Sequence, residues 1–174
     1  KAYGIAYWAL ENGLEIQWLL NHEGGSFLLP DAEAIRKECL IRGVRYEILD
    51  ENTALRRLED IERPEINKAA VRLQKAPRIA VYSPKGKQPW DDAVTLVLSY
   101  AEIPYDIIYD EEVLADVLPL YDWLHLHHED FTGQYGKFYS AYRFAPWYIN
   151  QKAQMEADAQ RFGFEKVSEL KSAV

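Results

Sequence analysis

The chain has 174 residues, of which 48% are hydrophobic and 28% are charged, and its formal net charge is −8. This length and composition predict a single globular domain with its own core, spanning residues 1–174. The negative charge excludes nucleic acid and anionic membrane surfaces as the main partners. No apolar run reaches the roughly 20 residues of a membrane span. The single cysteine, Cys39, excludes a disulfide framework and favours a cytoplasmic location.

Both ends of the sequence have helical patterns. Residues 1–13, KAYGIAYWALENG, form an apolar pattern that Gly13 closes as the C-cap of a helix would. Residues 165–174, EKVSELKSAV, form a helical pattern with no stop signal. We therefore expect a segment of a longer protein, truncated at both ends, whose remainder is one of its partners.

Strand-like and helix-like segments alternate between these ends. Apolar runs of strand length occupy residues 15–20, 45–50, 78–83, 105–110 and 121–127. Helical periodicity occurs over residues 31–42, 52–61, 64–76 and 90–101. Such alternation predicts an α/β fold with a mainly parallel sheet between two layers of helices. We expect a three-layer sandwich of flavodoxin-like or Rossmann-like type.

The last of these strands ends in a cluster of titratable side chains. In an open parallel sheet, ligands bind beyond the carboxyl ends of the strands. Strand alternation places His125 and His127 on one face, and His128, Glu129 and Asp130 follow directly. His-x-His is a metal-ligand spacing, so His125 and His127 are candidate ligands of a divalent metal. Alternatively, His127, His128, Glu129 and Asp130 form a catalytic acid–base site. A third reading is structural, in which His125 packs in the core and Glu129 or Asp130 caps the following turn.

A second candidate site follows the first predicted strand. The run NHEGGSF contains His22 and Glu23 before the pair Gly24 and Gly25. These glycines either let the backbone approach a ligand closely or make a tight turn before a second short strand, SFLL. In a single parallel sheet, His22 and Glu23 would lie at the same edge as the histidine cluster.

The loop after the strand at 78–83 has a weak phosphate-binding pattern. Lys85, Gly86 and Lys87 precede a helix, but the spacing matches neither GxxxxGK[ST] nor GxGxxG. Asp91 and Asp92 occupy the first turn of that helix, where they complement its dipole and would repel an anion. We therefore do not expect phosphate at this loop.

Residues 131–148, FTGQYGKFYSAYRFAPWY, are rich in aromatic side chains, which account for eight of the 18 residues. A long loop at the carboxyl end of a strand is commonly a lid or a binding loop. Tyr135 and Trp147 are candidates to stack on a sugar or another small ligand. The aromatics would otherwise cover the core of this domain or contact another part of the protein.

Four stretches carry a resemblance to a known family: KAYGIAYWALENGLEIQWLLN, GGSFLL, QPWDDAVTLVLSYAEIPYDIIYDEEVL and YDWLHLHHEDFTGQYGKFY. The sequence resembles a bacterial family commonly labelled asparagine synthetase B, over nearly its whole length. The resemblance implies a class I glutamine-amidotransferase-like α/β domain. Family members continue beyond the point matching Val174 into a Gly-rich strand and a Cys-containing turn. No SGGxDS-type loop occurs here, so the ATP-dependent chemistry of the label is not expected of these residues.

Two functional hypotheses follow. In the first, the chain is part of a hydrolase or amidotransferase-like enzyme, whose nucleophile lies outside this segment and meets the 127–130 cluster. In the second, the chain is a binding module that recognises a ligand or partner through residues 131–148 without catalysis.

Overall fold

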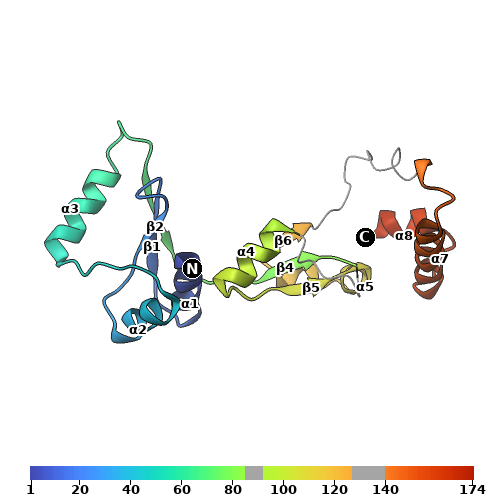
Figure 1. The fold of residues 1–174 in the computed structure, drawn as a ribbon, viewed down its shortest axis with the longest axis horizontal. Helices are drawn as coiled ribbons and strands as arrows, with labels where there is room; N and C mark the ends of the chain where they lie inside the picture. Colours follow the sequence, from blue (N-terminus) through green and yellow to red (C-terminus); the bar gives the residue numbers. More distant parts are fainter. Residues whose placement is uncertain (85–91, 127–139) are drawn as a thin grey trace. The chain divides into compact units, whose positions relative to one another are not determined.

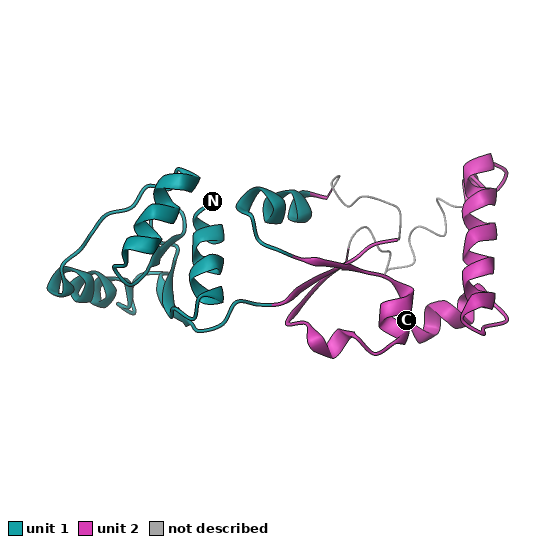
Figure 2. Cartoon of the chain, turned by 90° about the horizontal axis from the view of Figure 1, so that it is seen from below, with its two compact units in different colours: residues 1–77, 93–104 teal, residues 78–92, 105–174 magenta. Residues whose placement is uncertain are grey.

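A computed structural model describes residues 1–84, 92–126 and 140–174 (Figure 1). The described chain divides into two compact units, which Figure 2 colours teal and magenta. Unit 1 comprises Lys1–Pro77 and Ala93–Pro104, and unit 2 comprises Arg78–Asp92 and Tyr105–Val174.

Each unit contains a three-stranded sheet and several helices. The elements of unit 1 are α1 (Ala2–Glu11), β1 (Ile16–Leu20), β2 (Ser26–Leu28), α2 (Glu33–Arg42), α3 (Glu51–Ile61), β3 (Ala69–Leu73) and α4 (Ala93–Ala101). The elements of unit 2 are β4 (Ile79–Tyr82), β5 (Asp106–Ile108), α5 (Asp110–Leu114), η2 (Leu118–Leu120), β6 (Trp123–Leu126), α7 (Pro146–Arg161) and α8 (Val167–Ala173).

The sheet of unit 1 is antiparallel, with strand order β2-β1-β3. One of its faces packs against α1 in a core that includes Ala9, Leu10 and Ile16 (Figure 1). Two helix ends in this unit follow the expected capping chemistry. Gly43 ends α2 in the left-handed conformation, and the Asp50 carboxylate accepts a hydrogen bond from the Thr53 N–H at the start of α3.

Two predicted elements of unit 1 are wrong. The helix predicted over 64–76 is instead a turn followed by β3, because Ala69–Leu73 pairs along its whole length with β1. Pairing with a neighbouring strand here outweighs a weak local helical preference. The strand predicted over 45–50 is an extended segment without strand pairing, in which Tyr46 and Ile48 are exposed.

The sheet of unit 2 is parallel, with strand order β5-β4-β6. All four residues of the central strand β4 are buried. One face of the sheet, with Ala80, Tyr82 and Ile108, packs against side chains that include Val113 and Val174. Strands are confirmed within the predicted ranges 78–83, 105–110 and 121–127, as the shorter elements β4, β5 and β6.

The α/β class and the parallel strands are therefore confirmed. The strands do not form one mainly parallel sheet, since β1, β2 and β3 form an antiparallel sheet of their own. The 16-residue helix α7 was not predicted, because its first residues belong to the aromatic run that we assigned to a loop. No helix within the described residues is long and apolar enough to cross a membrane.

Candidate functional site

The strand order of unit 2 creates a switch point beside its central strand. The chain passes from β4 to β5 on one side, and then returns past β4 to add β6 on the other side. In open parallel sheets, ligands bind at the carboxyl ends of the strands where the order reverses in this way. We therefore expect a ligand site at the carboxyl ends of β4 and β6.

A His–Asp pair lies at this position. His125 lies on β6, beside Val81 of β4, and its Nε2 lies 2.8 Å from Oδ2 of Asp92. The two side chains are 17% and 11% exposed, so solvent screens their interaction only weakly. Because a carboxylate only accepts hydrogen bonds, Nε2 carries the proton, and the lone pair of the neutral ring is on Nδ1.

A buried hydroxyl lies on the same face of the sheet. Ser83 follows β4, two residues beyond Val81, and it is fully buried. Its backbone N–H donates to the Ile108 carbonyl, whereas its Oγ has no hydrogen-bond partner within the described parts of the chain. Buried polar atoms without partners are uncommon and are often found near functional sites. Its burial makes Ser83 unsuitable as a nucleophile without a change in conformation.

The opposite face of the same edge holds a buried charged cluster. Asp110, which is 3% exposed, accepts hydrogen bonds from the Tyr82 hydroxyl and from Lys171 Nζ, the latter at 3.1 and 3.2 Å. Lys171 Nζ also lies 3.5 Å from the Tyr109 hydroxyl. Burial lowers the pKa of Lys171, but Tyr109 and Asp110 raise it by more, so its net shift is upward. Lys171 therefore stays protonated and acts as a cation that fastens α8 to the sheet.

Most of the predicted catalytic cluster lies outside the described residues. This applies to His127, His128, Glu129 and Asp130, and also to the ligand-binding candidate Tyr135. Of the predicted metal ligands, only His125 is described. The described residues hold no group of three or more His, Cys, Asp or Glu side chains arranged to bind a metal. A divalent metal at His125 and His127 stays a prediction.

The second predicted site is in the other unit. His22, Glu23, Gly24 and Gly25 form the turn between β1 and β2, where both glycines have positive φ angles. The prediction that His22 and Glu23 share a sheet edge with the histidine cluster is wrong, because β1 and β6 belong to different sheets. The physical reason is the tight turn, which brings β2 back antiparallel to β1 without a crossover helix.

Part of the predicted aromatic loop is exposed at the start of α7. Phe144 is 79% exposed, and Trp147 is 45% exposed. The Trp147 ring lies 5.7 Å from that of Tyr142 and 5.8 Å from that of Tyr148, measured between centroids. These contacts join three aromatic rings into a surface cluster.

No protein-family model, curated protein or solved structure matches this chain.

Sequence patterns did not identify the residues that contact His125 and Asp110 at the sheet edge, which are Asp92 and Lys171. Asp92 was assigned to the helix dipole, although its position after β4 and its carboxylate could have marked it as a partner for His125. Lys171 had no comparable signal, because it lies 61 residues from Asp110 along the chain.

Proposed function

We propose that this chain supplies the acid–base part of an amide-hydrolysing site, in a class I amidotransferase-like domain with a three-layer arrangement. His125 is the general base, and Asp92 orients it. The observation that carries the proposal is the 2.8 Å contact between His125 Nε2 and Asp92 Oδ2, beside the switch point of a parallel sheet.

The chemistry follows from the tautomer that this contact requires. With its Nε2 proton directed at Asp92, His125 accepts a proton at Nδ1 from an attacking water, hydroxyl or thiol. Asp92 then stabilises the imidazolium, which returns the proton to the departing amide nitrogen. The nucleophile is assigned to the Cys-containing turn that the family resemblance places in longer members.

The predicted residues after β6 extend this site in the proposal. His127, His128, Glu129 and Asp130 follow His125 closely in the sequence, so they supply further proton-transfer groups or metal ligands. The same tautomer of His125 also suits a metal ligand, since a metal-bound histidine commonly donates its other N–H to a carboxylate.

We expect His125→Gln and Asp92→Asn each to lower kcat/KM for amide hydrolysis by about a hundredfold, the low end for a general base. The assay uses the full-length natural protein and measures ammonia released from glutamine, asparagine and a panel of primary amides. Asp60→Asn is the matched control, because Asp60 forms an exposed ion pair with Arg63 in unit 1. Wild-type rates in both variants, or no ammonia from the wild type on any amide, would refute the proposal.

A second candidate function is ligand binding without catalysis, favoured by the exposed cluster of Tyr142, Trp147 and Tyr148. The rings are inclined to one another, by 49° between Tyr142 and Trp147 and by 74° between Trp147 and Tyr148, so a single exposed ring face would stack on a sugar or another ring. The discriminating variant is Trp147→Ala. It should abolish sugar-induced changes in tryptophan fluorescence, whereas His125→Gln should leave them intact.

A further inference from the structure

The face of the unit 1 sheet that carries Gln17 and Leu19 borders a pocket of about 700 Å³, which Ala2 and Ile5 of α1 also line. Residues directly opposite one another in a sheet point to the same face. Gln17 is paired with Leu28 on one side and with Arg72 on the other, and Leu19 is paired with Ser26. All five side chains line the pocket, so they form its floor.

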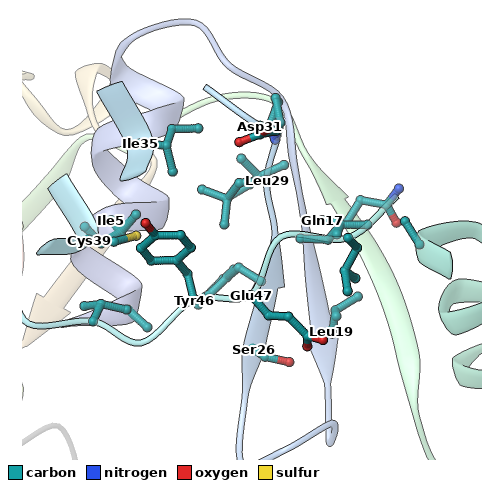
Figure 3. Close-up of a pocket in the computed structure, with 18 of the residues that line it drawn as sticks. Ile5, Gln17, Leu19, Ser26, Leu29, Asp31, Ile35, Cys39, Tyr46 and Glu47 are labelled. Atoms are coloured by element: carbon teal, nitrogen blue, oxygen red, sulfur yellow. The ribbon is translucent and has the colours of Figure 1, made fainter. Parts of the chain in front are cut away.

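The walls come from α2 and from the extended segment 44–49, which we call the strap. Ile35 and Cys39 of α2 line the pocket, as do all six residues of the strap. In Figure 3, Tyr46 and Glu47 extend in opposite directions from the strap, Tyr46 toward Ile35 and Glu47 toward Leu19. The predicted ligand-binding residues His22, Glu23 and Gly25 also line this pocket.

The size and the lining fit a small molecule with an apolar body. Ligand pockets commonly enclose 300–1,000 Å³ and combine apolar walls with a few polar groups. Here Leu19, Leu28, Ile35 and Val44 supply apolar surface. Gln17 has no side-chain hydrogen bond to any other described residue, so its amide remains available to a ligand.

Within the described parts of the chain, one of the arginines that line the pocket has no ion-pair partner. Three acidic side chains form ion pairs with three arginines, so their charges cancel: Glu15 with Arg72, Asp31 with Arg36, and Glu47 with Arg57. Glu23, in the hairpin turn, lies 3.9 Å from His22. Arg45, on the strap, has no ion-pair partner among the residues that the structure describes.

We propose that this pocket binds a small molecule that has an apolar body and a single carboxylate, with Arg45 as the carboxylate-binding residue. A guanidinium matches a carboxylate with two parallel hydrogen bonds. A dianion such as phosphate is disfavoured, because Arg45 is the one lining cation without an ion-pair partner among the described residues, and four acidic side chains line the same pocket. This binding site is independent of the His125–Asp92 pair.

The test is a titration of the ¹⁵N-labelled chain with octanoate, octan-1-ol and octylammonium, which share one apolar body and differ in charge. We expect octanoate to bind at least tenfold more tightly than octan-1-ol, with shifts at Leu19 and Leu28. Arg45→Gln should lower the octanoate affinity by at least tenfold, to the level of the alcohol. Arg56→Gln, on α3 but outside the pocket, should leave it unchanged.

A second variant tests the location of the apolar body. Ala54 lines the pocket from α3, so Ala54→Trp fills part of the space and should weaken octanoate and octan-1-ol alike. Circular dichroism checks that each variant keeps its helices. The proposal is overturned if octanoate causes no shifts at the pocket, if Arg45→Gln binds it as tightly as the wild type, or if octylammonium binds equally well.

Discussion

Replacing Lys171 with methionine is expected to lower the free energy of unfolding of unit 2 by about 3 kcal/mol, as when one partner of a buried ion pair is removed. The reason is that Asp110 is almost fully buried and would lose the cation that lies 3.1 Å from its Oδ1. Hydrogen exchange of the amides of β4 and β5 measures this loss within the unit concerned.

A double variant separates the ion pair from simple loss of packing. Asp110→Asn in the Lys171→Met background removes the unpaired charge, so it should restore a large part of the lost stability. Lys152→Met is the control, because Lys152 pairs with Glu156 on the surface of α7, where both side chains are more than half exposed. Equal exchange rates in Lys171→Met and wild type would show that the cluster does not stabilise the unit.

The pH dependence of this contribution follows from the raised pKa of Lys171. A lysine whose pKa is higher in the folded state than in the unfolded state stabilises the fold fully below the unfolded pKa. The stabilisation is lost only as the pH rises through the folded value, above the ordinary lysine value of 10.5. The difference between wild type and Lys171→Met should therefore stay constant across neutral pH and shrink only in strong alkali.

Gly4→Ala is expected to destabilise unit 1 by about 3 kcal/mol, because overpacking a tight contact commonly costs 1–3 kcal/mol and occasionally more. A Cβ at Gly4 of α1 would overlap the carbonyl oxygen of Ala101 at the end of α4, and that oxygen belongs to the backbone. The two helices would have to separate, which also disturbs the Arg42 hydrogen bond to the same carbonyl. Urea denaturation followed by circular dichroism measures the change.

Gly13→Ala is the matched control for this substitution. Gly13 has a φ of 74°, but no atom within 4 Å would meet a Cβ there. The variant should lose only about 1 kcal/mol, the cost of a left-handed conformation for an L-residue. A loss at Gly4 no larger than the loss at Gly13 would show that α1 and α4 do not pack closely at this point.

The local elements of this fold could be predicted from sequence wherever the pattern was strong. The helix predicted over 31–42 is α2 (Glu33–Arg42), and the strand predicted over 78–83 is β4 (Ile79–Tyr82); their signals are helical periodicity closed by Gly43 and a short apolar run. Strand alternation also assigned His125 to one face of β6, and its contact with Asp92 is consistent with that face.

What could not be predicted depends on long-range pairing. Nothing local in 69–73 shows that this segment pairs with β1, and the period of its apolar residues suits a helix nearly as well as a strand. The division of the strands into two sheets likewise depends on the turn at Gly24 and Gly25, where the sequence is compatible with either a ligand site or a tight turn. The Lys171–Asp110 pair needs tertiary structure to bring its members together.

The most direct measurement for the central claim is the tautomer of His125, observed by long-range ¹H–¹⁵N correlation NMR at a pH where the ring is neutral. The 2.8 Å contact with Asp92 predicts that Nε2 carries the proton and that Nδ1 is bare, and that Asp92→Asn perturbs both signals. A proton on Nδ1, or an Asp92→Asn spectrum identical to that of the wild type, would contradict an Asp92-oriented general base at this edge of the sheet.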